Sequence, residues 1–264
     1  MVPTHRPSAL PSAARQVART AKRQAKRAWR SLWFGPDLIR STWRLRRLER
    51  LVHTEGGRLA EIPVRFEGWG EFAIIRPKQV PWEITQLLNR LMRERVQAVC
   101  EIGTFRGGTF YLWCQAAADE ATLIAVDLPG EESLDLAFSK HRIEFYRRFA
   151  KTPKQTLHFL AADSHAQTTA HAVARLLGPR RLDFLFIDGD HTYEGVKRDV
   201  ELYRPLVRPG GLIALHDILP RRQCPEIQVY RFWDEVKRSY TSEEIVAPAS
   251  EAPEAVGIGL LRVP

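Results

Sequence analysis

The feature that most constrains this chain is a regular alternation of short apolar runs with longer amphipathic segments, which begins at about residue 97. The runs are rich in Val, Ile, Leu and Phe without polar alternation, which is typical of strands buried on both faces of a parallel sheet. Because each strand–helix–strand step crosses over right-handedly, the pattern predicts a doubly wound, Rossmann-like α/β fold. The expected strands are residues 97–103, 122–128, 157–163, 182–188 and 211–217, and the expected helices lie near 107–118, 132–149, 165–177 and 193–203.

Both ends of this alternation carry further elements. After a helix near residues 226–240, two short strands at 244–247 and 257–263 predict a hairpin, which would give a seven-stranded, mostly parallel sheet an antiparallel edge. Upstream, residues 71–76 predict a short strand, and Pro81 introduces an amphipathic helix over 82–95.

The charge distribution divides the chain into two parts. Residues 1–58 hold 14 Lys and Arg against 3 acidic residues, whereas residues 59–264 hold 26 basic and 28 acidic residues. We therefore expect a basic N-terminal extension over 1–58 and one domain over 59–264. A nearly neutral domain disfavours nucleic acid as the main partner.

The extension predicts two helices. Its apolar residues follow helical spacing from Ala14, and Gly35 and Pro36 then interrupt the chain, with Asp37 placed to cap a second helix that carries Leu38, Leu45, Leu48 and Val52 on one side. Four roles stay open for it: packing on the domain or on another subunit of a homo-oligomer, attachment to an anionic membrane surface, nucleic-acid contact, and organelle targeting. No apolar run reaches the roughly 18 residues of a membrane span, and three cysteines suit a reducing compartment, so we expect a cytoplasmic protein, with peripheral membrane attachment as the alternative.

Polar residues follow all five predicted strands. In open α/β sheets, ligands bind beyond the carboxyl ends of the strands. Four of the five strands finish on aspartate, and the first carries a glutamate, so this edge predicts a functional site. The residues there are Glu101, Asp127, Asp163, Ser164, Asp188, Asp190, His191, His216 and Asp217.

The loop after the first strand predicts a nucleoside ligand. Gly103, Gly107 and Gly108 let the backbone approach a ligand closely. The spacing is not the dinucleotide fingerprint, because Phe105 stands where that motif requires glycine. Asp127, at the end of the second strand, is positioned to accept both hydroxyls of a ribose. A nicotinamide dehydrogenase is therefore disfavoured.

Together, the run from Glu101 to Gly108, the acidic Asp127, and the later segments around Asp188 and His216–Asp217 resemble class I S-adenosylmethionine-dependent methyltransferases. The likeness is greatest to the small-molecule O-methyltransferase branch that includes macrolide-sugar O-methyltransferases and cephalosporin-hydroxylase-like proteins, and it covers roughly residues 72–263. The resemblance implies an S-adenosylmethionine site in which the cofactor contacts come from Glu101, Gly103, Thr104, Gly107, Gly108, Thr109, Asp127, Leu128, Asp163, Ser164 and Asp188.

The same resemblance implies a metal and a base. Members of this branch often bind Mg²⁺ through positions that correspond here to Asp188, His216 and Asp217. Since His216 departs from the commoner acidic residue, Mn²⁺, Fe²⁺ or Zn²⁺ are alternatives to Mg²⁺, as is an empty site. His191 matches the position of a basic residue that takes the proton of the substrate, with Asp190 as the alternative.

The sequence therefore predicts a methyltransferase that acts on a hydroxyl group of a small molecule, such as a sugar or another secondary metabolite, with the assistance of a divalent metal. Two alternatives from other classes remain. One is a hydroxylase-like relative with the same fold, which would consume oxygen. The other is a non-catalytic protein that binds a membrane surface through residues 1–58.

Overall fold

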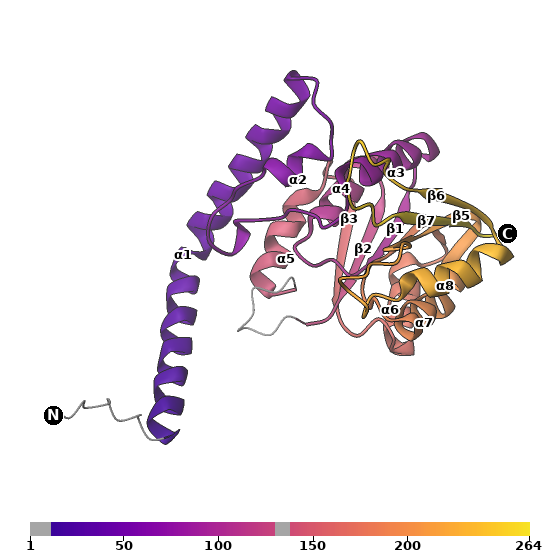
Figure 1. Ribbon diagram of the computed structural model, residues 1–264. Coiled ribbons are helices and arrows are strands. Elements are labelled where there is room, and N and C mark those ends of the chain that lie inside the picture. The colour runs from indigo at the N-terminus through magenta and orange to yellow at the C-terminus, as the bar shows by residue number, and fades with distance from the viewer. Residues whose placement is uncertain (1–11, 130–137) are drawn as a thin grey trace, which may run out of the picture.

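The computed structural model describes residues 12–129 and 138–264, and for most of residues 12–31 it describes the helical backbone alone. A seven-stranded sheet with the order β3-β2-β1-β4-β5-β7-β6 forms the centre of the molecule (Figure 1). The first five strands pair in parallel, and β7 pairs antiparallel with both β5 and β6. The strands are β1 (Ala98–Ile102), β2 (Thr122–Asp127), β3 (Thr156–Ala161), β4 (Leu182–Ile187), β5 (Val207–His216), β6 (Thr241–Ile245) and β7 (Ile258–Arg262). The predicted fold and its antiparallel edge are confirmed.

Helices cover both faces of the sheet. The helices of the domain are α2 (Glu61–Arg65), α3 (Pro81–Glu94), α4 (Gly108–Ala116), α5 (Lys140–Tyr146), α6 (Gln167–Leu177), α7 (Tyr193–Tyr203) and α8 (Val229–Val236), with short 3-10 turns at Gly70–Phe72, Arg147–Phe149, Arg204–Leu206 and Lys237–Ser239. Successive strand residues point to opposite faces. In β1, accordingly, Val99 packs with α3, α4 and α5, whereas Cys100 and Ile102 pack with α6, α7 and α8.

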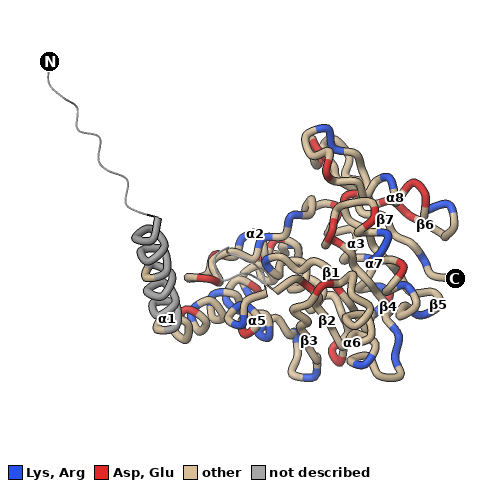
Figure 2. The backbone as a smooth tube through the Cα atoms, turned by 90° about the horizontal axis from the view of Figure 1, so that it is seen from below, with Lys and Arg blue, Asp and Glu red and all other residues tan. Residues whose placement is uncertain are grey.

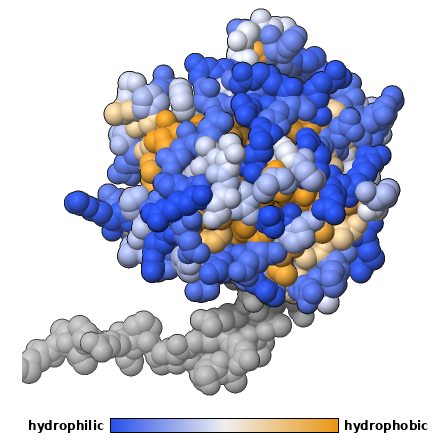
Figure 3. All heavy atoms as spheres, turned by 90° about the vertical axis from the view of Figure 1, so that its right-hand side faces the viewer, coloured by the Kyte–Doolittle hydropathy of each residue, from blue (hydrophilic) through white to orange (hydrophobic). Residues whose placement is uncertain are grey.

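The strand order reverses between β1 and β4, because the chain runs outward from β1 to β2 and β3 and then returns to the other side of β1. At such a switch point, the loops that leave the two neighbouring strands turn to opposite faces of the sheet and leave a crevice at the carboxyl edge. The loops after β1 and β4 therefore frame the candidate site. The last strand of the sheet, β6, forms one of its two lateral edges. It carries Thr241, Ser242, Glu243 and Glu244, which are exposed, as suits an edge strand. The face on this side of the molecule is largely hydrophilic (Figure 3).

The N-terminal segment differs from its prediction. One helix, α1 (Ser12–Thr54), runs through Pro36, so the predicted interruption at Gly35–Pro36 is wrong. Proline removes one backbone hydrogen bond and bends a helix without always ending it, and Figure 1 shows that α1 changes direction part-way along its length. Its second half packs on the domain through Leu45 and Val52, which join the same core as α3 and α4. No helix in the described ranges combines the length and the apolarity that crossing a bilayer requires.

Two other predictions are corrected or narrowed. The strand expected at residues 71–76 is absent; a 3-10 turn at Gly70–Phe72 and an irregular segment to Val80 occupy this stretch. This segment packs on the start of α4, because a Cβ atom built on Gly108 would lie 2.0 Å from the carbonyl oxygen of Ile75. The helix expected near 132–149 begins at Lys140, and residues 130–137 lie outside the described part of the chain.

Candidate active site

The loop after β1 lies directly against the end of β4. Gly103 has a φ of +86°, and a Cβ atom built on it would lie 2.2 Å from the carbonyl oxygen of Asp188. Only glycine fits this position, because both the backbone conformation and the space exclude a side chain. The contact joins the two loops that frame the switch point.

The other two glycines of the loop are also explained by packing within the protein. Gly107 has a φ of +80°, and a Cβ atom on it would lie 2.5 Å from the ring of Tyr146, while Gly108 adjoins Ile75 as described above. Phe105, at the tip of the loop, has a φ of +46° and remains 38% exposed. The loop thus packs on Tyr146 and Ile75 and exposes its tip to solvent.

Asp127 holds this loop from the end of β2. Its Oδ2 accepts hydrogen bonds from the backbone N–H groups of Thr104 (2.9 Å) and Phe105 (2.8 Å), and its Oδ1 accepts one from Leu128 (2.8 Å). Burial raises the pKa of Asp127, although these three hydrogen bonds work in the opposite direction. Oδ1 retains a lone pair beyond its single partner, and the Leu128 side chain beside it is 62% exposed. A carboxylate acceptor next to exposed apolar surface suits a nucleoside.

Glu101, Thr104 and Thr109 lie beneath the loop and are buried. Glu101 accepts a hydrogen bond from the indole N–H of Trp113 (2.8 Å), and the hydroxyl of Thr109 also bonds to it. Burial raises the pKa of Glu101 to about 8. In this arrangement, these side chains support the loop from within the protein.

Asp163 and Ser164 follow β3 in a turn. Oδ1 of Asp163 accepts a hydrogen bond from the backbone N–H of His165 (2.9 Å), and the carbonyl oxygen of Ser164 accepts one from the hydroxyl of Tyr203 (3.1 Å). Asp163 is exposed, and Ser164 is half-buried. The two residues thus lie at the same edge of the sheet as Asp127, on the neighbouring strand.

Across the switch point, three side chains converge. One oxygen or nitrogen atom from each of Asp188, His191 and Asp217 lies within 4.8 Å of the others. Nδ1 of His191 is 3.5 Å from Oδ2 of Asp217 and 3.9 Å from Oδ1 of Asp188. Asp217 has a φ of +66°, which is rare for aspartate and turns its side chain into this group. Two carboxylates and an imidazole can hold a divalent cation, and they can equally orient a base.

His216 lies beside this group and is buried. Its Nδ1 is 3.0 Å from Oδ1 of Asp188 and 3.4 Å from Oδ1 of Asp217, and its Nε2 is buried without a partner. Burial lowers the pKa of His216, but the two carboxylates outweigh burial and raise the pKa to about 10. His191 thus joins Asp188 and Asp217 in a potential ligand group, and His216, which the sequence also predicted as a ligand, bridges the two acids through Nδ1.

Two supporting residues escape sequence reasoning. The buried side chain of Gln79 donates from Nε2 to Oδ2 of Asp188 (2.6 Å), and Arg221 forms an ion pair with Asp217. Because His216 and Arg221 offset the cost of its burial, the pKa of Asp217 lies below its ordinary value. Gln79 and Asp188 are 109 positions apart, and no local pattern in the sequence connects them.

Asp190 occupies a different place. Its Oδ1 accepts a hydrogen bond from the backbone N–H of Thr192 (2.8 Å), and a Cβ atom on Gly195 would lie 2.2 Å from its carboxyl carbon. Asp190 therefore packs on the first turn of α7. Of the two candidate bases, His191 alone belongs to the converging group.

Comparison with known proteins finds similar sequences and folds. A family model described as a methyltransferase domain matches residues 100–218, which run from β1 to just beyond β5. An uncharacterized protein of Acanthamoeba polyphaga mimivirus is 31% identical over 134 residues, which are 48% of this chain and 54% of the relative. A protein of Sinorhizobium fredii is 27% identical over 177 residues, or 63% of this chain and 17% of the relative. The chain thus spans about half of one curated relative and less than a fifth of the other.

Among solved structures, an O-methyltransferase from Bacillus cereus in complex with SAH superposes with a TM-score of 0.53 at 11% identity, covering 89% of this chain and 99% of that chain. At this identity, the likeness concerns the fold. Together with the family match, it confirms the resemblance drawn from the strand ends. Residues 100–218 of this chain thus match a methyltransferase-domain model, and the chain shares the fold of the Bacillus cereus O-methyltransferase.

Proposed function

We propose that this chain is an S-adenosylmethionine-dependent O-methyltransferase that acts on a hydroxyl group of a small molecule. The observation that carries the proposal is the convergence of Asp188, His191 and Asp217 directly beside the loop of Gly103. A nucleoside at one side of the switch point and a proton acceptor at the other are what methyl transfer to a hydroxyl requires.

The residues around Asp127 fit the cofactor. The free lone pair of Asp127 Oδ1 suits a ribose hydroxyl, the exposed Leu128 suits a flat apolar ring, and the backbone of Gly103–Gly107 suits the methionine part. Asp163 and Ser164 lie on the side where the adenine would extend. When bound, the cofactor supplies an electrophilic methyl group on a sulfonium.

His191 suits the role of base. Its Nδ1 faces Asp217 and Asp188, which favours the tautomer with the proton on Nδ1 and leaves Nε2 to accept a proton. An alcohol is a poor nucleophile until its proton leaves, and a neutral imidazole accepts that proton near neutral pH. In this scheme, the acceptor oxygen takes the methyl group and its proton passes to His191, while the carboxylates stabilise the resulting imidazolium.

A divalent metal centre at Asp188, His191 and Asp217 is the second candidate role for this group. The donor set of two carboxylates and one imidazole fits Mn²⁺, Fe²⁺ or Zn²⁺ at least as well as Mg²⁺, which prefers oxygen ligands. A bound cation would supply a lower hydroxyl pKa and a fixed acceptor orientation. His191 would then be a ligand instead of the base.

Methyl transfer can be measured with radiolabelled S-adenosylmethionine and a panel of sugars and phenols. Label in an acceptor, with one S-adenosylhomocysteine formed per methyl group, is the expected result. Oxygen consumption without methyl transfer would assign the hydroxylase-like alternative, and binding of NADH without S-adenosylmethionine would contradict the cofactor assignment. If a metal is required, a chelator abolishes the activity and Mn²⁺ or Mg²⁺ restores it; turnover that is insensitive to chelator leaves His191 as the base.

We also propose that α1 attaches the enzyme to an anionic membrane surface. Leu32, Ile39 and Trp43 are 75%, 71% and 56% exposed, and their spacing places them along one side of the helix. Arg40, Arg47 and Arg50 are exposed too, and Lys and Arg gather where α1 meets α5 (Figure 2). Apolar side chains flanked by arginine suit a bilayer of anionic lipid.

Co-sedimentation with phosphatidylglycerol vesicles, compared with phosphatidylcholine vesicles, tests the attachment. We expect binding to the anionic vesicles alone, and a loss of that binding in I39E. If neither vesicle binds and the chain is a dimer whose contact I39E disrupts, this side of α1 is an interface between two copies instead.

A further inference from the structure

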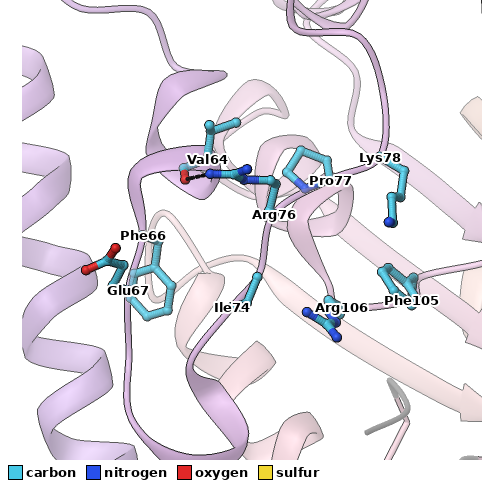
Figure 4. A pocket seen from close by; sticks show the side chains of 9 residues that line it. All are labelled: Val64, Phe66, Glu67, Ile74, Arg76, Pro77, Lys78, Phe105 and Arg106. Atoms are coloured by element: carbon cyan, nitrogen blue, oxygen red, sulfur yellow. Dashed lines mark hydrogen bonds between the residues drawn. The ribbon is translucent and has the colours of Figure 1, made fainter.

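A cavity lies on the outer side of the glycine loop. It has a volume of about 370 Å³ and lies between α2, the segment that precedes α3, and the tip of the loop (Figure 4). Its walls include Val64 and Phe66 from the α2 side, Arg76 and Lys78 from the segment, and Phe105 and Arg106 from the loop. This volume is enough for an aromatic or sugar ring with one substituent.

Three cations line this pocket, and in the described part of the chain none of them has an acidic partner. Arg76 donates to the carbonyl oxygen of Val64 (3.3 Å), and Nε of Arg106 is buried without a hydrogen-bond partner. Within residues 12–129 and 138–264, neither these two arginines nor Lys78 forms an ion pair with a carboxylate. The one acid in the lining, Glu67, lies 3.8 Å from Arg44 of α1, and Figure 4 shows it pointing away from the cations.

An aromatic ring lies close to two of these cations. Nζ of Lys78 is 5.8 Å from the centre of the Phe105 ring, and Cζ of Arg106 is 5.3 Å from it. Phe105 adopts an unfavourable left-handed conformation and leaves 38% of its surface exposed. Uncompensated cations beside an exposed ring suit an anionic ligand that also has an apolar, planar part.

Two lining residues link the pocket to the candidate active site. Lys78 precedes Gln79, whose side chain bonds to Asp188, and the backbone N–H of Phe105 bonds to Asp127. The walls of the pocket are therefore connected to Asp188 on one side of the switch point and to Asp127 on the other.

We propose that this pocket binds the anionic group, a phosphate or a carboxylate, of a ring-bearing acceptor. The identification of the ligand as the acceptor rests on the proposed methyltransferase function. Arg76, Lys78 and Arg106 bind the anion, and Phe105 packs on the ring. They are specificity-determining residues, and they take no part in the proton transfer.

Calorimetry on the full chain tests the proposal with three probes: phenyl phosphate, benzoate and neutral benzyl alcohol. We expect at least one of the two anions to bind tenfold or more tightly than benzyl alcohol, with an affinity that falls as salt is added. The ratio of phenyl phosphate to benzoate affinity tells whether the pocket prefers phosphate or carboxylate. K78Q and R106Q should each weaken anion binding about tenfold, whereas R175Q, the same change at an exposed arginine of α6, should leave it unchanged.

The control is the binding of S-adenosylhomocysteine to the same samples, with melting curves that verify folding. If the anions bind no better than benzyl alcohol, or if K78Q and R106Q bind them as R175Q does, the pocket proposal is overturned, and intact S-adenosylhomocysteine binding leaves the proposed function standing. If the anions bind as expected but S-adenosylhomocysteine does not bind, the proposed function fails, and the ligand of the pocket is not an acceptor.

Discussion

Replacing Asp127 by asparagine separates its two roles, holding the loop and contacting a ribose. An amide oxygen in the place of Oδ2 keeps the hydrogen bonds from Thr104 and Phe105, whereas the amide nitrogen then faces the N–H of Leu128 and loses that bond. A hydrogen bond to a charged group contributes about 1.5–3 kcal/mol. We therefore expect D127N to lower the free energy of unfolding by about 1–3 kcal/mol, and D127A, which removes all three hydrogen bonds, to lower it by about 3 kcal/mol or more.

The ribose contact has its own signature in ligand binding. Calorimetry with S-adenosylhomocysteine and with its 2′-deoxyribose analogue should give the native chain a preference for the ribose of roughly 10- to 100-fold, the equivalent of one hydrogen bond to a carboxylate. In D127N, this preference should fall to less than about threefold, because the charged acceptor is gone. A loop disturbed by the substitution would weaken both ligands equally. An unchanged ratio in D127N would therefore refute the ribose assignment, even if both affinities fell.

Three further predictions test separate parts of the account. H191A should lower kcat by about 10²- to 10⁴-fold while S-adenosylhomocysteine affinity is retained, whereas D190N should change kcat little; equal losses in both variants would argue against His191 as the base. Burial raises the pKa of Glu101 from its ordinary value of 4.5 to about 8. Between these pH values the unfolded chain loses this proton while the folded chain keeps it, so the free energy of unfolding falls as the pH rises. The melting temperature of E101Q should match that of the native chain below about pH 4.5 and exceed it at about pH 8, and a constant difference would contradict the assigned burial. G103A should lower the free energy of unfolding by more than about 3 kcal/mol in urea titrations, because of its left-handed φ and its contact with Asp188; an unchanged value would mean that the two loops do not meet there.

The sheet could be predicted because its signals are local. Each parallel strand is a short apolar run, and each run ends on a polar residue, so the position of Asp127 at the sheet edge follows from the sequence. The path of α1 could not be predicted in this way. Pro36 is a local signal for an interruption, but packing of Leu45 and Val52 on the domain supports a continuous helix.

The composition of the converging group was also beyond local reasoning. His216 and Asp217 are neighbours, and the side chains of adjacent strand residues normally point to opposite faces. The left-handed conformation of Asp217 redirects its side chain toward His191. The hydrogen bond between Gln79 and Asp188 depends on where an irregular segment crosses the sheet edge, which is set by its packing on Gly108. Such contacts arise from tertiary structure, and residue spacing alone does not contain them.

The central claim is that this sheet edge holds an adenosyl sulfonium with its methyl group directed toward an acceptor beside His191. A crystal structure of the chain soaked with S-adenosylhomocysteine tests it most directly. The account predicts the ribose hydroxyls at Asp127, the adenine beyond Leu128, and the sulfur facing the group formed by Asp188, His191 and Asp217. A nucleoside bound elsewhere, or crystals that stay free of ligand at saturating concentration, would contradict it.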